Sequence, residues 1–167
     1  ELDVTLKPDI EKEKLFDELR RKSLYHDSLI VLVSDHGEEF FEHGWWRHGK
    51  TLYQEQLHVP FVVKWPDGVS FERRRKDVVQ QIDLVPTVLD LLGEPIPDDL
   101  RGRSLVRLAL LDPEVSSYLR SDGREVESVV YRGQKLVRTF VYDRDTPPFA
   151  LFDLMEDPGE TKNVLNA

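Results

Sequence analysis

The chain has 167 residues, of which 40% are hydrophobic and 33% are charged, a composition typical of a folded domain rather than a disordered chain. The formal net charge of −9 argues against a broad nucleic-acid surface, and no apolar run reaches the roughly 18–20 residues that a membrane-spanning helix needs. Because the sequence contains no cysteine, disulfides and a cysteine nucleophile are excluded within these residues.

The first predicted elements are a helix and then a strand. Apolar residues recur at helical spacing from Asp9 onward, and residues 29–34 form an apolar run that ends in serine. Such a run is typical of a strand buried on both faces of a parallel sheet. It stops at Asp35 and His36, with Gly37 next, and ligands bind at the carboxyl ends of strands in open α/β sheets. Since carboxylate and imidazole groups both bind metals, Asp35 and His36 are candidate metal ligands.

The segment 37–57 is predicted to be a long polar loop. Four of the five histidines of the chain fall within residues 36–58, together with several glutamates. A loop that gathers such residues by chance and a functional loop are both consistent with this pattern. The position of the Asp-His pair at a strand end favours the functional interpretation. Trp45 and Trp46 lie in the same loop, and we expect them to pack there or to shape specificity.

The later elements divide the chain into two predicted parts. We expect residues 1–111 to form part of an α/β core and residues 112–167 to form a small α+β subdomain, because short β-strands dominate beyond residue 112. The predicted elements are a strand over 59–65, a helix that begins near Pro86 with Asp83 as its cap, a short helix around 105–111, strands over 126–130, 135–142 and 149–154, and a terminal helical turn within 160–167.

Several short motifs, taken in order, resemble the C-terminal part of the sulfatase family, within the alkaline-phosphatase-like superfamily of metal-dependent hydrolases. Each motif alone is weak, and the resemblance rests on their order and spacing over nearly the whole chain. The motifs are Ser34-Asp35-His36-Gly37-Glu38, His48-Gly49-Lys50-Thr51-Leu52-Tyr53-Gln54-Glu55, His58-Val59-Pro60-Phe61, Ile82-Asp83-Leu84-Val85-Pro86-Thr87-Val88-Leu89, Arg101-Gly102-Arg103-Ser104-Leu105, Leu151-Phe152-Asp153-Leu154 and Asp157-Pro158-Gly159-Glu160.

The resemblance implies a fold and a site. The fold is an α/β sandwich with a largely parallel sheet, followed by a small antiparallel C-terminal sheet with a helix. Asp35 and His36 match the family's metal-binding pair, with Ca²⁺ the metal most often bound and Mg²⁺, Mn²⁺ or Zn²⁺ as alternatives. His48 and Lys50 occupy the neighbourhood of the family's basic residue, which touches the sulfate or phosphate. The usual family spacing places a lysine at the position of Gly49, so either neighbour could take this catalytic and substrate-binding role. His43 is a further candidate for substrate contact, or for fixing the loop.

The chain also lacks features that the resemblance leads one to seek. Sulfatases carry a Cys/Ser-x-Pro-x-Arg motif, whose first residue is oxidised to formylglycine, and an upstream acidic pair that completes the metal site. Neither occurs in these residues. We therefore expect the chain to be a C-terminal fragment that is inactive alone, with formylglycine in the missing N-terminal part.

The resulting functional prediction is metal-dependent hydrolysis of a small-molecule or carbohydrate sulfate ester. Two alternatives stay open. One is phosphodiester or phosphonate hydrolysis, or phospho-group transfer, within the same superfamily; the other is an inert fragment with a structural role. We expect no nucleic-acid partner and no membrane span, and we expect self-association through an exposed sheet edge. Sulfatases are often exported, but these residues show no signal sequence, and the compartment stays open.

Overall fold

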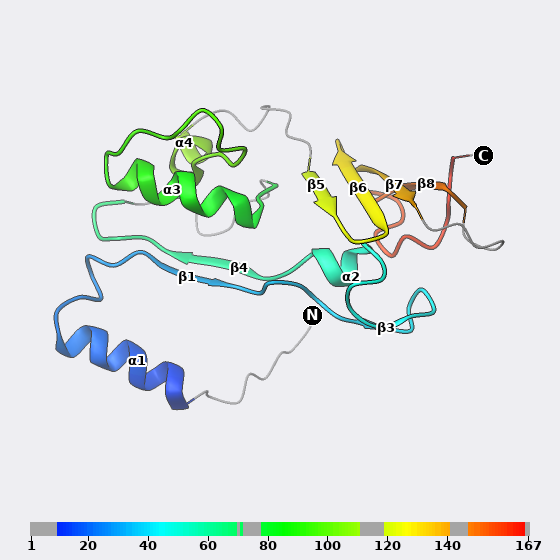
Figure 1. Ribbon diagram of the computed structural model, residues 1–167. Coiled ribbons are helices and arrows are strands. Elements are labelled where there is room, and N and C mark those ends of the chain that lie inside the picture. The colour runs from blue at the N-terminus through cyan, green and yellow to red at the C-terminus, as the bar shows by residue number, and fades with distance from the viewer. Residues whose placement is uncertain (1–9, 70, 72–77, 111–118, 141–146, 166–167) are drawn as a thin grey trace. The chain divides into compact units, whose positions relative to one another are not determined.

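The computed structural model describes residues 10–69, 71, 78–110, 119–140 and 147–165 (Figure 1). The chain divides into two compact units. One comprises residues 1–32 and 61–73, and the other comprises residues 33–60 and 74–167. The predicted boundary at residues 111 and 112 lies outside the described residues. In the part of the chain that the structure describes, we find no helix that is long and apolar enough to cross a membrane.

The first unit contains helix α1 (Ile10–Arg21) and the paired strands β1 (Ile30–Val33) and β4 (Phe61–Lys64). The two strands run in opposite directions (Figure 1). Leu32 of β1 is 52% exposed, so the expectation that the strand within residues 29–34 is buried on both faces is wrong for this residue, and Val62 of β4 is 56% exposed. The reason is that the described sheet has only two strands here. Both of its edges are therefore open, which leaves the predicted self-association as a prediction.

The predicted polar loop contains regular structure, all of it in the second unit. Strands β2 (Glu39–Phe40) and β3 (Trp46–Arg47) form a small antiparallel hairpin, and helix α2 (Gln54–Leu57) follows as a single turn. Gly44 turns the hairpin with a φ of 89°, a left-handed conformation that glycine adopts without strain. The chain thus leaves β1, folds into the hairpin and reaches α2 before it enters β4.

The predicted helices after β4 are present. A 3₁₀ turn, η1 (Gln81–Asp83), leads into α3 (Leu84–Leu91), and α4 (Leu105–Leu110) follows. Asp83 is the N-cap residue of α3, as expected, but its side chain makes no cap hydrogen bond to that helix. Its buried carboxylate accepts hydrogen bonds from the Gln80 N–H at 2.9 Å and the Arg103 N–H at 2.8 Å, so it ties η1 to the segment before α4.

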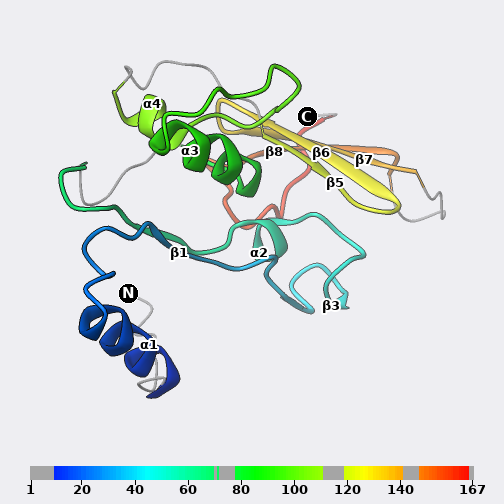
Figure 2. The ribbon, with the colours of Figure 1, turned by 60° about the vertical axis from the view of Figure 1, so that its left-hand side comes forward.

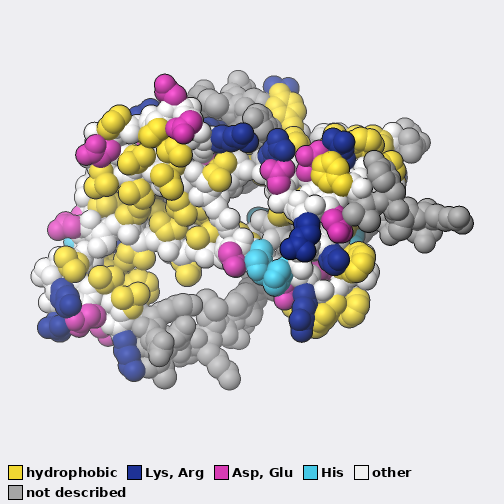
Figure 3. All heavy atoms as spheres, in the orientation of Figure 1, with side chains coloured by type: hydrophobic (Ala, Val, Ile, Leu, Met, Phe, Trp, Pro, Cys, Tyr) yellow, Lys and Arg dark blue, Asp and Glu magenta, His cyan; other side chains and the backbone are white. Residues whose placement is uncertain are grey.

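Hydrogen bonds join α3 to the start of α4, while part of the apolar face of α3 is uncovered. Thr87 Oγ1 accepts the Leu105 N–H at 2.9 Å, and Leu105 is one of the few buried apolar side chains. By contrast, Val85 and Leu92 are 55% and 70% exposed. Figure 3 shows exposed apolar side chains gathered over this helix.

The C-terminal sheet has four antiparallel strands in the order β5-β6-β7-β8 (Figure 2). The strands are β5 (Leu119–Asp122), β6 (Val126–Tyr131), β7 (Gln134–Thr139) and β8 (Phe149–Asp153). This sheet confirms the predicted small antiparallel sheet, although β5 was not predicted. The tail does not form the predicted helical turn over its described residues 160–165. Instead, the Asp157 carboxylate accepts the Lys162 N–H at 2.8 Å and so folds the tail into a turn.

Candidate metal and anion site

The Asp35-His36 pair lies directly after β1, in a backbone that neighbouring groups fix. The side-chain amide of Gln81 donates to the carbonyl oxygens of Ser34 at 2.6 Å and Asp35 at 2.8 Å. The Ser34 hydroxyl donates to the His36 carbonyl at 2.7 Å. The Asp35 side chain is 87% exposed. Its carboxylate therefore faces solvent, while these hydrogen bonds fix the backbone that carries it.

The hydrogen bonds of His36 determine which ring nitrogen can bind a ligand. Nδ1 lies 2.7 Å from the Gly37 carbonyl oxygen, which can only accept, so Nδ1 carries a proton. In the neutral ring, Nε2 then has a lone pair, and it lies 3.6 Å from Asp35 Oδ2. The His36 N–H donates to Asp35 Oδ1 at 3.0 Å. This bond lowers the pKa of Asp35, as does the positive charge of His36 whenever its ring is protonated, and both favour the Asp35 anion.

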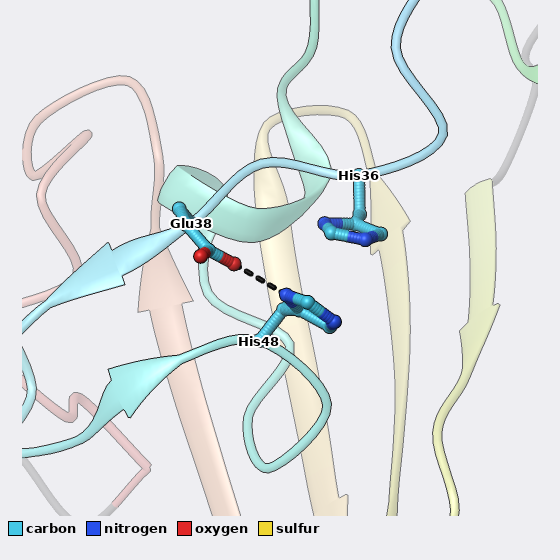
Figure 4. A group of neighbouring side chains, drawn as sticks. All are labelled: His36, Glu38 and His48. Atoms are coloured by element: carbon cyan, nitrogen blue, oxygen red, sulfur yellow. Dashed lines mark hydrogen bonds and ion pairs between the residues drawn. The ribbon is translucent and has the colours of Figure 1, made fainter.

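His48 joins this site from the far side of the hairpin. Its ring lies 3.8 Å from the His36 ring, centroid to centroid, and its Nδ1 is hydrogen-bonded to Glu38 Oε1 (Figure 4). Glu38 immediately precedes β2, and His48 immediately follows β3. The pairing of these two strands therefore brings His48 beside His36, as Figure 4 shows.

The donor set of Asp35 and His36 fits a divalent metal. A carboxylate oxygen and a ring nitrogen with its lone pair lie 3.6 Å apart, and no proton of the neutral ring lies between them. The lone pairs of the two atoms repel each other at this separation, and a cation that binds both atoms makes the arrangement favourable. Because divalent cations take four to eight ligands, these two residues would form part of such a site. Glu38 and His48 bind each other and are less available as ligands.

Lys50 lies in the same loop but contacts a different partner. Its ammonium group lies 5.8 Å from the centre of the Trp45 ring, a cation–π contact. No carboxylate among the described residues pairs with it, so its charge is open to an anion. Trp45 and Trp46 are 49% and 51% exposed. The structure thus places His48 beside His36. The contact described for Lys50 is with Trp45 and does not involve His36.

His43 belongs to a separate, buried group. Nδ1 lies 2.6 Å from Glu55 Oε1, and Nε2 lies 3.1 Å from the Gly159 carbonyl and 3.3 Å from the Glu160 carbonyl. Its side chain is 13% exposed and stacks on Tyr53 at 3.6 Å. Burial lowers the pKa of His43, but the hydrogen bond and charge of Glu55 outweigh this, so the net pKa is raised. These contacts support the alternative that His43 fixes the loop, and its contact with substrate stays a prediction.

Four buried polar residues that surround this group were not predicted. Glu39 and Lys135 are 0% exposed, and Gln56 and Glu160 are 4% and 2% exposed. Residue type misleads here, because glutamate and lysine are rarely buried. Strand alternation gave one signal: on β7, Lys135 lies on the covered face and its neighbours Gln134 and Leu136 are exposed.

Comparisons with known proteins agree with these features. Residues 41–167 match the family N-sulphoglucosamine sulphohydrolase, C-terminal. Arylsulfatase K from Gallus gallus is 31% identical over 163 residues, 90% of this chain and 30% of the relative. N-acetylglucosamine-6-O-sulfatase from Bacteroides thetaiotaomicron is 28% identical over 161 residues, 90% of this chain and 29% of the relative. The extracellular sulfatase SULF-1 homolog of Drosophila melanogaster is 30% identical over 102 residues, 61% of this chain and 9% of the relative.

Solved structures share the fold. A phosphonate monoester hydrolase from Silicibacter pomeroyi is 27% identical with a TM-score of 0.73, over 93% of this chain and 34% of that protein. A structure solved in complex with its substrate D-glucosamine-2-N,6-O-disulfate is 22% identical with a TM-score of 0.70, over 92% of this chain and 33% of that protein. The chain thus spans about a third of each of these proteins except the Drosophila melanogaster sulfatase, of which it spans 9%. It belongs to the sulfatases of the alkaline-phosphatase-like superfamily, in the family named N-sulphoglucosamine sulphohydrolase, C-terminal.

Proposed function

We propose that this chain is part of a metal-dependent sulfatase that hydrolyses sulfate esters. In this proposal Asp35 and His36 bind the metal, and His48 and Lys50 bind the anion. The observation that carries it is the pair of donors after β1: Asp35 Oδ2 and His36 Nε2 lie 3.6 Å apart, while Nδ1 of the same ring is held by a backbone carbonyl. Membership of the sulfatase family supports the same chemistry.

Each residue has a role that follows from its contacts. Asp35 supplies an anionic oxygen, and His36 supplies a nitrogen lone pair in a fixed ring orientation. The bond between Glu38 and Nδ1 of His48 orients that ring, so Nε2 is the atom that can exchange a proton with the leaving oxygen. The exposed ammonium group of Lys50 attracts the sulfate charge. When bound, the metal supplies Lewis-acid stabilisation of charge on the nonbridging oxygens.

The metal and the nucleophile are the finer parts of the proposal. We propose Ca²⁺, because Asp35 offers the hard oxygen that Ca²⁺ prefers. Mn²⁺ or Zn²⁺ would accept the His36 nitrogen more readily, which makes them the alternatives. The nucleophile, which we propose to be a formylglycine, would come from residues of the full gene product outside this chain, as would the remaining metal ligands.

For the substrate we propose a sulfated carbohydrate. The support comes from relatives: one is named N-acetylglucosamine-6-O-sulfatase, and one structural neighbour was solved with a disulfated glucosamine. The sequence left the compartment open; we now propose export from the cell, which is supported by a relative named extracellular sulfatase.

A second function is favoured by one observation. Over the aligned part, the phosphonate monoester hydrolase is 27% identical to this chain, compared with 22% for the protein solved with the disulfated glucosamine. The donors at Asp35 and His36 would suit a phosphonate or phosphodiester equally well, because both esters present anionic nonbridging oxygens. The choice between sulfate and phosphonate therefore depends on residues outside this chain.

The test compares esters and variants. We would measure hydrolysis of 4-nitrophenyl sulfate and bis(4-nitrophenyl) phosphate by the full gene product, by its Asp35→Asn variant and by the 167-residue chain alone. We expect sulfate hydrolysis by the full product, its loss in D35N, and no activity of the isolated chain. Preferential hydrolysis of the phosphate ester would favour the second function. Unchanged sulfatase activity in D35N would contradict the site.

A further inference from the structure

Gln56 of α2 connects the two segments that carry the site histidines. Its backbone carbonyl accepts the Gly37 N–H at 2.8 Å, next to His36. Its side-chain oxygen accepts the Gly49 N–H at 3.0 Å, next to His48. The side-chain nitrogen is also held, because it donates to Glu39 Oε2 at 3.0 Å. One buried residue thus fixes the backbone beside both rings.

The close approach of α2 to the His36 segment depends on Gly37. A Cβ atom at this position would lie 1.9 Å from the carbonyl oxygen of Glu55, closer than any real contact allows. The bond between Gly37 and Gln56 therefore forms only because residue 37 has no side chain. As a result, a movement of α2 is transmitted to the backbone beside His36.

The start of α2 is held in turn by an ion pair from the C-terminal sheet and tail. Tyr53 offers no side-chain cap to this four-residue helix. The Gln54 N–H instead donates to Glu160 Oε2 at 2.6 Å, 106 residues later in the chain. Lys135 Nζ lies 2.6 Å from Glu160 Oε1 and donates to the Leu52 carbonyl at 2.5 Å. Both charged side chains are fully buried.

A competing role for this region is a second metal site at Glu39, His43 and Glu55, whose ligand atoms lie within 4.8 Å of one another. The hydrogen bonds argue against it. Both nitrogens of His43 face acceptors, so both carry protons. Each oxygen of Glu39 already accepts two hydrogen bonds. No lone pair of these two residues is left to bind a cation.

We propose that Lys135 and Glu160 are positioning residues of the site: through α2 and Gln56, their ion pair fixes how His36 and His48 lie relative to each other. The effect of these residues on turnover rests on the proposed function, whereas their effect on ring geometry does not. A misplacement of about 1 Å can reduce turnover roughly 100-fold, so a scaffold contact of this kind can control the rate without touching substrate.

The test is a double-mutant cycle in the full gene product. Glu160→Ala and Gln56→Ala should each lower kcat about 30-fold with KM changed less than about threefold, because both misplace the same rings. The double variant should lose no more than the worse single variant, since both substitutions break one path. Glu160→Gln keeps an acceptor for the Gln54 N–H and should recover part of the turnover. Losses that multiply in the double variant would overturn the proposal.

The matched control is Arg138→Gln, on the same strand as Lys135. Arg138 pairs with Glu127 at 3.4 Å, but the two side chains are 48% and 27% exposed. This variant should leave kcat unchanged. A kcat loss equal to that of E160A would show that any damage to the sheet has this effect, which would contradict a specific path.

A readout that does not need activity separates the two proposals. Nuclear magnetic resonance of the histidine rings should show the His36–His48 contact in the wild type, and its loss in E160A and Q56A but not in R138Q. Inactive wild-type protein that shows this pattern would refute the proposed function and support the positioning role. Unaltered ring contacts in both variants would refute the positioning role, whatever the activity. If E160A does not fold, Q56A and E160Q provide the same comparison.

Discussion

The second unit contains two carboxylate–imidazole groups, one with two histidines and one glutamate and the other with one histidine and two glutamates, that differ in how many of their polar atoms are hydrogen-bonded. His36, Glu38 and His48 lie at the surface, whereas Glu39, His43 and Glu55 lie inside. In the inner group both nitrogens of His43 are engaged, and Glu39 accepts four hydrogen bonds. In the outer group Nε2 of His36 and the exposed Asp35 carboxylate beside it leave lone pairs open.

If the outer group binds a metal as proposed, hydrogen-bond partners, more than residue type or clustering, distinguish a binding site from a structural network. A group whose polar atoms all have hydrogen-bond partners stabilises the fold. A group with a fixed backbone and polar atoms that lack such partners can bind a ligand. Substitutions in the two groups should therefore differ in whether they reduce activity or stability. Those in the outer group should reduce activity and leave stability intact, and those in the inner group should reduce stability first.

The largest expected effect is that of Asp35→Asn on activity. Replacing the anionic oxygen by an amide of similar shape should lower kcat about 1,000-fold, or about 4 kcal/mol in activation free energy. The melting temperature should change little, because the side chain is 87% exposed. Asp17→Asn, at an exposed acid on α1, is the control and should alter neither quantity. A large fall in the melting temperature of D35N would contradict the distinction.

Glu39→Gln should have the largest effect on stability. The new amide would face donors from Thr51 and Gln56, which now donate to Glu39 at 2.6 and 3.0 Å. We expect the free energy of unfolding, measured in urea, to fall by about 3 kcal/mol. Glu42→Gln, at an exposed glutamate of the same hairpin, should cost under about 0.5 kcal/mol. Equal effects of the two variants would show that burial of Glu39 does not matter.

Gly37→Ala should have the next largest effect. The added Cβ would meet the Glu55 carbonyl at 1.9 Å, so α2 must shift, at a cost of about 2 kcal/mol in unfolding free energy. Gly159→Ala is the matched control, because its Cβ would meet only Thr161, at an ordinary 3.7 Å. Thermal unfolding of both variants measures the difference. A G37A protein as stable as G159A would show that this close approach is absent.

The pH dependence of stability should be smaller. The pKa of His43 is raised above its ordinary 6.5 in the folded state, so the folded protein holds this proton more tightly. The resulting stabilisation is fully present below about pH 6.5 and is lost as pH rises through the raised pKa. Urea unfolding at several pH values should show a fall in stability above pH 6.5 that His43→Gln removes. The same fall in H43Q would assign it to another group.

Asp90→Asn should have the smallest effect. The hydrogen bond from Arg107, and then that from Ser104, lowers the pKa of Asp90. Since Arg107 is 61% exposed, we expect a loss of only about 0.5 kcal/mol in unfolding free energy, measured in urea. A loss above about 2 kcal/mol would show that the ion pair between Asp90 and Arg107 contributes to stability as a buried pair does.

The sequence predicted the elements that have strong periodicity. The strand within residues 29–34 and the helix after Asp83 were predicted because their apolar patterns are local. The end of a strand is also visible in sequence, which made Asp35 and His36 candidate ligands, and their binding of a metal stays a prediction. The division of the 37–57 loop into β2, β3 and α2 was not found, since two-residue strands leave no periodic pattern.

The inner group could not be predicted for a different reason. Next to this group, Lys135 contacts Leu52 across 83 positions of the chain, and Glu160 contacts Gln54 across 106 positions. No local sequence pattern encodes such contacts. In sequence, a buried glutamate whose oxygens are fully hydrogen-bonded cannot be distinguished from a glutamate exposed to water. The two roles left open for His43, substrate contact and fixing the loop, reflect this same ambiguity.

The most direct test of the central claim is a crystal structure of the full gene product grown with Mn²⁺, whose anomalous scattering locates the ion. We predict an anomalous peak within roughly 2.0–2.6 Å of the Asp35 carboxylate and on the His36 side of it. A peak at Glu39, His43 and Glu55 without one at Asp35 would contradict the account.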